Sequence, residues 1–305
     1  MKKNNMFQTP ILVIAYHRVE STHDLFMALR EVQPEKLYVA ADGALSNDRT
    51  DYQHCLEARC VFIPDWKCEM KTLFKETHQG KSKMFVQAMQ WFFEQEEEGI
   101  VLFDDTVPTA DFFHFCKQML EMYRTDRRIG HISGSYLLKH NRLDEGSYYF
   151  SAYPLTWGFA TWRDRFENFD LKMKELENVV FRTLTDKYLM KKKHANFWQR
   201  RFRILQKNQV DIWEYQYIFH LWNQGALTVV PNVNLVENRG FLTKRRRIRK
   251  LNRPLGTIHP IRQNTKVEQD ADADKYVFRR YFKKDFRTIL ANWVKENLLG
   301  EEKTV

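Results

Sequence analysis

The first hundred residues alternate short β-branched runs with stretches of helical periodicity. We expect strands over residues 11–16, 36–41, 68–74 and 99–103, and helices over residues 22–32, 48–60 and 81–98. Because parallel strands need a long crossover, which a helix supplies, this alternation is typical of βαβ units. The sequence therefore predicts an α/β fold in which a Rossmann-like sheet is flanked by helices.

The pattern changes beyond residue 103. We expect a helix over 111–123 capped by Asp111, short strands over 128–133 and 147–151, and an aromatic, glycine-rich loop over 155–163. Further on, the spacing predicts a long basic helix over 184–206, a helix over 213–223, a strand over 227–230 and an amphipathic helix over 275–299. The fold therefore includes a basic, helical C-terminal extension.

The positive charge of the chain is concentrated in its C-terminal half. The chain has 49 Lys and Arg against 39 Asp and Glu, a formal net charge of +10. Residues 182–207 hold nine of these cations and one acid, while residues 239–250 hold seven cations and no acid. Such segments suit an anionic membrane surface or a phosphate-bearing acceptor, and a solvated basic face is the alternative. No nucleic-acid-binding module is recognisable, so we expect no nucleic-acid partner.

Several classes of protein lose support because their sequence signatures are missing. The longest apolar run, residues 11–16, is far shorter than the roughly 20 residues that cross a bilayer, and the first residues lack a signal-peptide pattern. We therefore expect a cytoplasmic protein. The chain has no dinucleotide-binding glycine motif after its first strand, no P-loop, and no HExxH zinc motif. Its four cysteines lack the spacing of a zinc site.

Polar residues gather where the predicted strands end. His17 and Arg18 follow the first strand, Asp42 follows the second, and Asp104 and Asp105 follow the fourth. In a doubly wound sheet the ligand binds outside the carboxyl ends of the strands. Two adjacent carboxylates there can hold a hard cation, such as Mg²⁺ or Mn²⁺, together with a diphosphate. The alternative is that Asp105 caps a turn and Asp104 faces water.

A series of short motifs, in order along residues 9–240, carries a family resemblance. The motifs are 9–18 (TPILVIAYHR), 38–43 (YVAADG), 99–105 (GIVLFDD), 132–134 (ISG), 157–162 (WGFATW), 211–216 (DIWEYQ) and 231–236 (PNVNLV). Together they resemble GT-A nucleotide-sugar glycosyltransferases, and more narrowly the bacterial sugar transferases often labelled haemolysin-like. A more distant resemblance is to the N-acetylglucosaminyltransferase that initiates complex N-glycans. The GT-A resemblance implies a domain of this fold over residues 1–240, followed by a basic loop and amphipathic helix over 241–305.

The resemblance implies a binding site for the nucleotide sugar at the strand ends. Ala15, His17 and Arg18 would contact the nucleotide or its phosphates. Asp42 would accept a hydrogen bond from the base, for which a uracil N–H is the natural donor. Asp104 would contact the ribose.

The same resemblance implies a metal site beside the diphosphate. Asp105 would be the one protein ligand of a Mn²⁺ or Mg²⁺ ion that bridges the two phosphates. His78 would lie near the diphosphate, with an ordinary loop histidine as the alternative. The chain departs from the family at Phe103, where the usual motif begins with a glutamate. Phenylalanine cannot bond a sugar hydroxyl, so this departure bears on donor affinity or donor choice. The chain also lacks the Ala-Thr-His segment that usually follows the position of Gly240.

For catalysis, an inverting reaction needs a base to remove the proton of the attacking hydroxyl. The resemblance implies Glu214 in this role, with Asp211 one helical turn earlier. The alternative is that Asp211 is an N-cap and Glu214 a solvated helix residue. Trp157 and Gly158 would contact the acceptor or the sugar. Of the four aromatic residues in this region, we expect at least two to be core: Tyr149, Tyr153, Trp157 and Trp162.

Taken together, the resemblance and these residues predict a metal-dependent hexosyl- or N-acetylhexosaminyl-transferase, with inversion as the expected course and retention as the alternative. It would move a sugar from a nucleotide diphosphate sugar, with UDP as the expected nucleotide, to a glycan hydroxyl. Bacterial relatives of this kind serve surface-polysaccharide or lipopolysaccharide assembly, so a lipid-linked acceptor at the inner face of the cytoplasmic membrane is expected. The alternatives are a catalytically degenerate GT-A protein and a protein that binds anionic surfaces or nucleic acid.

Overall fold

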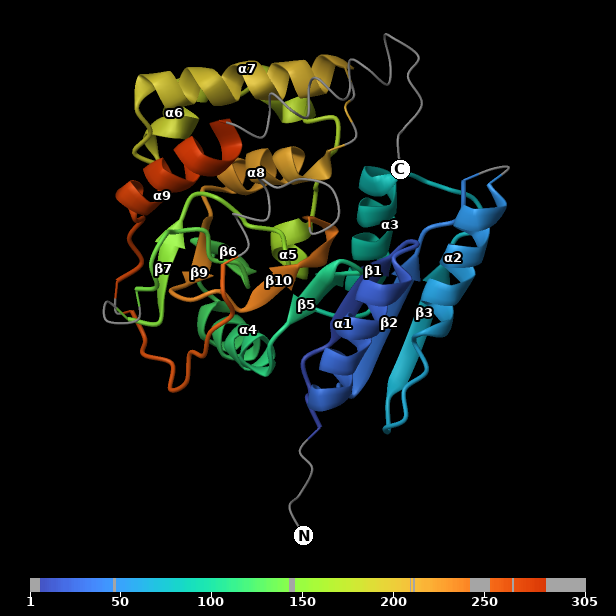
Figure 1. Ribbon diagram of the computed structural model, residues 1–305. Helices are drawn as coiled ribbons and strands as arrows, with labels where there is room; N and C mark the ends of the chain where they lie inside the picture. The colour runs from blue at the N-terminus through green and yellow to red at the C-terminus, as the bar shows by residue number, and fades with distance from the viewer. Residues whose placement is uncertain are drawn as a thin grey trace.

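The computed structural model describes residues 6–45, 48–142, 146–208, 210, 212–241, 253–264 and 266–283 (Figure 1). Within these residues, one eight-stranded sheet has the strand order β3-β2-β1-β4-β8-β6-β9-β7. It contains parallel and antiparallel pairs and is packed by helices on both faces. The expected α/β fold with a Rossmann-like mixed sheet is therefore confirmed.

One half of the sheet is parallel. Its strands and helices alternate along the chain as β1 (Ile11–Ala15), α1 (Val19–Val32), β2 (Lys36–Ala41), α2 (Arg49–Cys60), β3 (Glu69–Phe74), α3 (Lys81–Phe93) and β4 (Glu98–Phe103). β1 lies between β2 and β4 and pairs with both in parallel. The predicted elements are all present, although α1 begins earlier, at Val19, and α3 ends earlier, at Phe93.

Alternate residues of β1 face two different hydrophobic clusters. Ile11, Val13 and Ala15 pack in a cluster with α1 and with α4 (Ala110–Tyr123), whereas Leu12 and Ile14 pack in a cluster with α3. All five side chains of β1 are buried. A parallel strand covered on both faces has no solvent-facing side, which explains why the run is apolar throughout rather than alternating with polar residues.

The other half of the sheet contains the antiparallel pairs. β8 (Phe159–Trp162) runs antiparallel to β4 and to β6 (Ile129–Ser133). β6 is parallel to β9 (Leu227–Pro231), which pairs antiparallel with β7 (Tyr148–Ser151). A separate ribbon joins β5 (Thr106–Pro108) to β10 (Val236–Asn238). The predicted loop over 155–163 is therefore wrong, because its second half is a buried central strand.

The predicted cap of α4 is also wrong. Thr109 is the N-cap, and its hydroxyl accepts a hydrogen bond from the backbone N–H of Phe112 at 3.3 Å. Asp111 lies within the first turn, where its Oδ2 accepts a hydrogen bond from the backbone N–H of Ile258 at 2.8 Å. Asp111 therefore attaches the later chain segment to α4.

Four helices gather beside β7 and β9, at the upper left of Figure 1. They are α6 (Phe181–Asp186), α7 (Lys192–Asn208), α8 (Trp213–Gln224) and α9 (Ala271–Val277), which continues as a π-helical turn, Phe278–Phe282. The predicted basic helix over 184–206 is thus two helices. Leu189 between them has φ of 48°, in the left-handed region, which a continuous α-helix cannot contain.

Three short elements complete the described fold. α5 (Arg163–Phe166) directly follows β8, and 3₁₀ turns occur at Lys174–Glu177 and Arg239–Phe241. The helix predicted over 275–299 begins earlier, at Ala271, and its part beyond residue 283 lies outside the described residues. The predicted division of the chain at residue 240 stays a prediction. Among the residues that the structure describes, no helix is long and apolar enough to cross a membrane.

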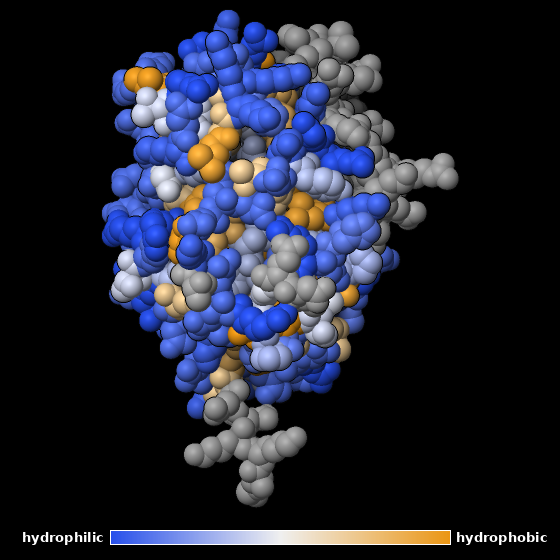
Figure 2. Space-filling view, turned by 90° about the vertical axis from the view of Figure 1, so that its left-hand side faces the viewer, coloured by the Kyte–Doolittle hydropathy of each residue, from blue (hydrophilic) through white to orange (hydrophobic). Residues whose placement is uncertain are grey.

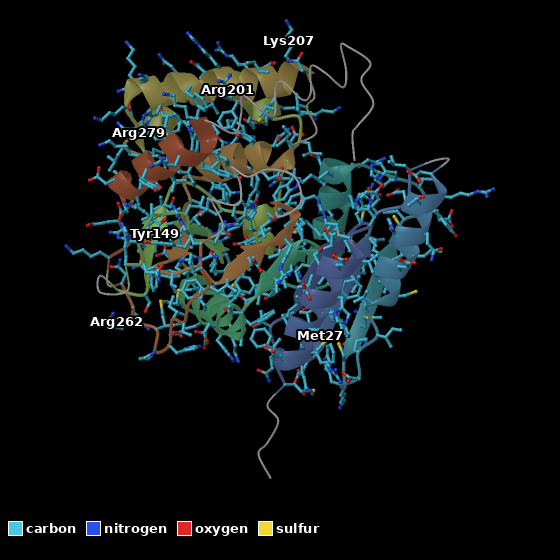
Figure 3. The ribbon with its side chains drawn as sticks, viewed as in Figure 1. Met27, Tyr149, Arg201, Lys207, Arg262 and Arg279 are labelled. Atoms are coloured by element: carbon cyan, nitrogen blue, oxygen red, sulfur yellow. The ribbon has the colours of Figure 1, made fainter. Side chains whose placement is uncertain are left out.

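The outer face of α7 carries a row of exposed cations. Figure 3 shows basic side chains along the top of this helix, with Lys207 near its end. The exposed members of the row form no ion pair within the described part of the chain: Lys192, Lys193, Arg200, Arg203 and Lys207. Hydrophilic side chains also cover most of the face that lies on the left in Figure 1 (Figure 2). The cations named above on α7 are therefore exposed, and a membrane or phosphate partner for them stays a prediction. Most of the second basic segment, residues 242–250, lies outside the described residues.

A buried carboxyl group joins α9 to the sheet. Asp274 is 5% exposed, and it accepts hydrogen bonds from the Ser151 hydroxyl, from the Ala152 backbone N–H at 2.9 Å and from the Gln269 amide at 2.7 Å. Burial raises the pKa of Asp274 to about 7, although these hydrogen bonds favour the ionised form. Below about pH 7 and above the ordinary pKa of an aspartate, Asp274 is therefore protonated in the folded protein and ionised in the unfolded chain.

This pKa predicts a loss of stability as the pH rises. Because the folded state holds the proton more tightly, the contribution of Asp274 is fully present below about pH 4 and disappears as the pH approaches 7. Asp274→Asn imitates the protonated group, so it should match wild type near pH 4 and exceed it at pH 8, by up to roughly 4 kcal/mol. Urea unfolding at both pH values measures this. The exposed Asp272→Asn is the control, and an equal pH dependence in wild type and Asp274→Asn would contradict the assignment.

Candidate functional site

The carboxyl ends of β1, β2 and β4 lie side by side, and the polar residues that follow them form one cluster. Asp104 is 4% exposed. Its Oδ2 accepts a hydrogen bond from the backbone N–H of Tyr16 at 2.8 Å, and its Oδ1 accepts one from Arg18 Nη1 at 3.0 Å. Asp104 thus joins the ends of β1 and β4, and the alternative that it faces water is wrong.

Arg18 lies between the two aspartates. Its Nη1 is 3.0 Å from Asp104 Oδ1 and 3.3 Å from Asp105 Oδ2. Burial lowers the pKa of this guanidinium, but the two carboxylates outweigh burial and raise it. About half of the Arg18 side chain remains exposed, so its other N–H groups are available to an anionic ligand.

Asp105 is the more accessible of the two carboxylates. Its side chain is 19% exposed, against 5% for Asp104. Burial raises the pKa of Asp105, as does the Asp104 carboxylate, while Arg18 and Lys81 lower it. A cation or a bound proton would therefore relieve the electrostatic cost of this carboxylate.

The turn after β10 forms one wall beside Asp105. The backbone N–H of Arg239 donates to the Asp105 carbonyl at 2.7 Å. A Cβ at Gly240 would come within 2.4 Å of Asp105 Oδ2, so any side chain here would force the Asp105 carboxylate to move. The glycine thus permits the close approach of the backbone to the carboxylate.

These residues fit a divalent ion that takes a single protein ligand. Both oxygens of Asp104 accept hydrogen bonds, so Asp105 is the carboxylate that could bind a metal. No group of three potential ligands from His, Cys, Asp and Glu occurs in the described part of the chain. The remaining ligands would have to come from water or from a bound diphosphate.

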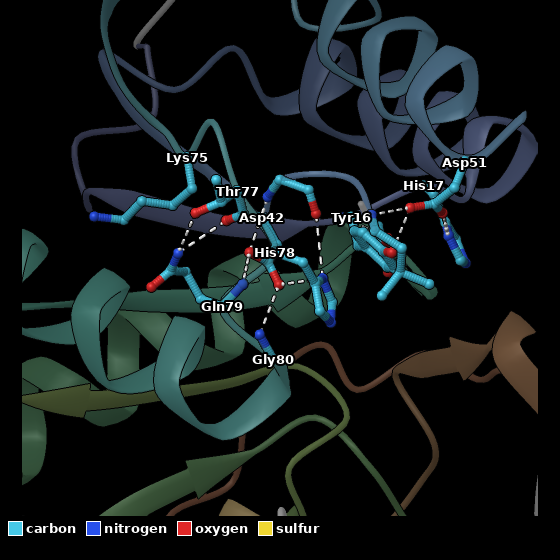
Figure 4. Close-up of polar contacts among 12 residues, drawn as sticks. Tyr16, His17, Asp42, Asp51, Lys75, Thr77, His78, Gln79 and Gly80 are labelled. Carbon is cyan, nitrogen blue, oxygen red and sulfur yellow. Dashed lines mark hydrogen bonds and ion pairs between the residues drawn. The ribbon is translucent and has the colours of Figure 1, made fainter. Parts of the chain in front are cut away.

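Asp42 holds the end of β2 against the start of α3 (Figure 4). It is 4% exposed, and its oxygens accept hydrogen bonds from the backbone N–H groups of Gly43 and Gln79, both at 2.8 Å, and of Gly80 at 3.1 Å. His78 Nδ1 lies 3.0 Å from Asp42 Oδ2. Asp42 therefore occupies the positive, N-terminal end of α3. The family resemblance implies a nucleotide base beside Asp42 and a diphosphate beside His78 at this position.

A fourth carboxylate at this edge, Asp51, was not identified from the sequence. It is 6% exposed and accepts hydrogen bonds from the Tyr16 hydroxyl at 2.6 Å and the Leu45 backbone N–H at 2.7 Å, while His17 Nδ1 lies 2.5 Å away (Figure 4). Burial raises the pKa of Asp51, but these hydrogen bonds outweigh burial and lower it. Asp51 thus fixes the orientation of His17. Its position in the first turn of the helix after β2 was the available signal.

Glu214 lies in the first turn of α8 and reaches across to α3. Its Oε1 forms an ion pair with Lys81 Nζ, the first residue of α3. Its Oε2 is buried and has no hydrogen-bond partner among the described residues. Burial lowers the pKa of Lys81, but Glu214 and then Asp105 outweigh burial, so the pKa is raised and the ammonium stays charged. Asp211, the other candidate for catalysis, lies outside the described residues.

Aromatic stacking positions the start of α8. The Trp213 ring stacks on Phe85, with centroids 3.6 Å apart, and lies 5.7 Å from Phe103 in a second stacked arrangement. Trp213 is buried. Phe103 therefore packs against the residue next to Glu214 and helps to set its position.

The predicted acceptor residues, Trp157 and Gly158, directly precede β8 in the chain. Gly158 has φ of 69°, and a Cβ there would lie 3.0 Å from Val236 and 3.2 Å from Leu102. The close approach that glycine permits is thus to side chains of the fold. Trp157 is partly buried against the α6–α9 cluster. The expectation that at least two of the aromatic group are core is confirmed by the buried members: Tyr149, Tyr153 and Trp162.

Two surface hollows lie away from this edge. One runs along α4 beside His114 and His259, and the other lies near Glu98, Trp162 and Phe166. Neither is lined by the carboxylates at the strand ends. Both hollows are lined by charged side chains, but neither contains Arg18, Lys81 or Asp105, so the strand ends remain the candidate site.

Comparison with known proteins gives no family assignment. No family model matches the chain, and no curated protein matches it. Similar solved structures include the 4-diphosphocytidyl-2C-methyl-D-erythritol synthase from Anaerococcus prevotii, with a TM-score of 0.36 and 7% identity, covering 73% of this chain and 88% of that one. HddC from Yersinia pseudotuberculosis has a TM-score of 0.33 and 9% identity, covering 52% of this chain and 78% of that one. The function proposed below rests on the side chains at the sheet edge.

Proposed function

We propose that the chain is a GT-A glycosyltransferase that uses a nucleotide diphosphate sugar. The observation that carries the proposal is a series of charged contacts: Arg18 Nη1 lies 3.3 Å from the accessible carboxylate of Asp105, and Lys81, whose charge lowers the pKa of Asp105, forms an ion pair with the candidate base Glu214. A diphosphate needs cations and a divalent ion, and a sugar acceptor needs a base close to them. This cluster contains residues suited to both needs within one sheet edge.

The proposed donor site uses the outer side of this cluster. Arg18 would bind the phosphates through its exposed N–H groups, because Asp104 holds the guanidinium in place from behind. His17, oriented by Asp51, would contact the nucleotide beside it. Asp42 would act mainly by holding the loop before α3, since its oxygens already accept three backbone N–H groups.

The proposed reaction is a direct displacement at the anomeric carbon. The acceptor hydroxyl oxygen forms the new bond to this carbon while the bond to the β-phosphate oxygen breaks, and the leaving electron pair stays on the nucleoside diphosphate. Glu214 takes the proton of the hydroxyl. Arg18 stabilises the departing charge, and Mn²⁺ or Mg²⁺, when bound at Asp105, would supply further positive charge to it.

Loss of the base or of the metal ligand should reduce turnover. Glu214→Gln keeps the shape of the side chain but cannot take a proton, so kcat should fall by about 10²- to 10⁴-fold. Asp105→Asn should lower activity and weaken its dependence on Mn²⁺. A panel of UDP-sugars measured for transfer and hydrolysis tests both. Glu94→Gln, an exposed acid at the other end of α3, is the control.

The panel also separates the alternatives. Full activity in both site variants would contradict the catalytic roles. Binding of UDP without turnover of any sugar in wild type would instead favour a degenerate GT-A protein, in which Phe103 replaces the acid that its relatives use. The thermal unfolding of each variant must match that of wild type, because a misfolded variant would lose activity for another reason.

For the acceptor, we propose a lipid-linked glycan presented at an anionic membrane surface. The supporting observation is the row of unpaired cations on α7, with the exposed Leu189 and Val180 at the two ends of α6. Each suitably placed cation contributes about 1 kcal/mol to binding an anionic bilayer. Leu189 and Val180 would add a small apolar contact.

Vesicle binding tests this partner. Wild type should sediment with vesicles of phosphatidylglycerol and not with vesicles of phosphatidylcholine. Replacing the α7 cations Arg200, Arg203 and Lys207 by glutamine should reduce binding about tenfold or more. The matched control replaces three exposed cations elsewhere: Arg49, Lys67 and Lys117. Equal loss in both triple variants, or none in either, would contradict a membrane role for α7.

A further inference from the structure

Lys81 connects the two parts of the candidate site. Its ammonium is paired with Glu214 Oε1, and its charge also acts on Asp105. Glu214 and Lys81 are 133 positions apart in the sequence and come from the N-terminal ends of α8 and α3. The pair is therefore a tertiary contact at the point where the donor and acceptor halves of the site meet.

This ion pair conflicts with the role of Glu214 as a base. A carboxylate accepts the proton of an acceptor hydroxyl through one of its oxygens. The ammonium occupies Oε1, while Oε2 is buried with no hydrogen-bond partner among the described residues. One oxygen is thus covered by Lys81 and the other is buried, so the ammonium must leave before Glu214 can accept a proton at Oε1.

The Lys81 side chain is able to leave. It is 59% exposed, and Glu214 is its one ion-pair partner among the described residues. A lysine is a flexible point charge that can be redirected by rotation of its side chain. An exposed pair of this kind contributes about 1 kcal/mol or less, so a stronger anion nearby can compete for the ammonium.

The proposed donor supplies that anion. Lys81 directly follows Gly80, whose backbone N–H donates to Asp42 at the same sheet edge at 3.1 Å, so a diphosphate bound beside Arg18 and Asp105 would lie within reach of the flexible Lys81 side chain. The diphosphate carries more negative charge than the Glu214 carboxylate and offers several acceptor oxygens. The exchange would leave the ammonium paired, now with phosphate, and would free Oε1.

We propose that Lys81 is a latch on Glu214, which the diphosphate of the bound donor releases. The latch rests on the proposed glycosyltransferase function and adds a sequence of events to it. With no donor bound, the ammonium covers the base. Donor binding moves the ammonium onto the diphosphate, and Glu214 then becomes free to receive the acceptor hydroxyl. The donor must therefore bind before a productive acceptor.

A double-mutant cycle with UDP as the probe tests the latch. The full-length wild type, Glu214→Gln, Lys81→Met and the double variant are titrated with UDP in the presence of Mn²⁺ by isothermal calorimetry. If UDP must take the ammonium from Glu214, then removing the Glu214 charge should tighten UDP binding by about two- to fivefold. The same Glu214→Gln change made in the Lys81→Met background should give no gain, because the ammonium is already absent.

The cycle separates a latch from general electrostatics. A negative charge near the phosphates would weaken UDP binding even without a latch, but its removal would then help equally in both backgrounds. Equal gains, or no gain in wild type, would overturn the latch while UDP binding by wild type still supports the proposed function. If wild type binds no UDP, both fail. Lys83→Met, an exposed lysine on the same helix, is the matched control and should leave the gain unchanged.

A second measurement uses the wild-type side chains. Reductive methylation with ¹³C-formaldehyde keeps lysines charged and labels them for NMR, and the Lys81→Arg protein identifies the Lys81 signal. The latch predicts that UDP moves this signal and that Glu214→Gln moves it in the absence of UDP. A Lys81 signal that stays unchanged at saturating UDP would overturn the latch, whatever the stability of the variants.

Discussion

The hydrogen bonds of the buried Asp104 carboxylate are the contact on which the rest of the site depends. A carboxylate at 4% exposure is costly unless it is paired and hydrogen-bonded. Asp104 meets that requirement with the Tyr16 backbone N–H and the Arg18 guanidinium. The same bonds join the ends of β1 and β4 and fix Arg18 beside Asp105, so the cation and the accessible carboxylate are placed together before any ligand binds. Asp42 joins the end of β2 to the start of α3 in a similar way, because its carboxylate accepts hydrogen bonds from backbone N–H groups there.

The sequence predicted the parallel half of the sheet because most of its strands are short apolar runs. β1 and β2 are buried runs, α1 between them has clear helical periodicity, and α2 after β2 has Asp48 as its N-cap. β8 was missed because its four residues acquire strand structure from partners far along the chain, β4 and β6. The break between α6 and α7 was missed because Leu189 gives no sign in sequence of its left-handed backbone.

The positions of several site residues could also be predicted from the sequence, but their contacts could not. The rule that ligands gather at strand ends located Asp42, Asp104, Asp105 and Arg18, because sequence position alone puts them at that edge. Sequence position could not predict which side chains of the site pair with one another. The Asp51–His17 contact spans 34 positions, and the Lys81–Glu214 pair spans 133, so both depend on how the helices pack. Lys81, an ordinary first-turn lysine in sequence, becomes a connecting residue only through the stacking of Trp213 on Phe85.

The central claim is that the edge formed by Arg18, Asp104 and Asp105 binds a nucleoside diphosphate. The most direct test is calorimetric titration of the wild-type protein and of Asp105→Asn with UDP, in Mn²⁺ and in EDTA. The account predicts that UDP binds wild type in Mn²⁺ and that Asp105→Asn, like EDTA, weakens binding by about tenfold or more. Absence of UDP binding to wild type, or the same affinity in the folded Asp105→Asn variant, would contradict it.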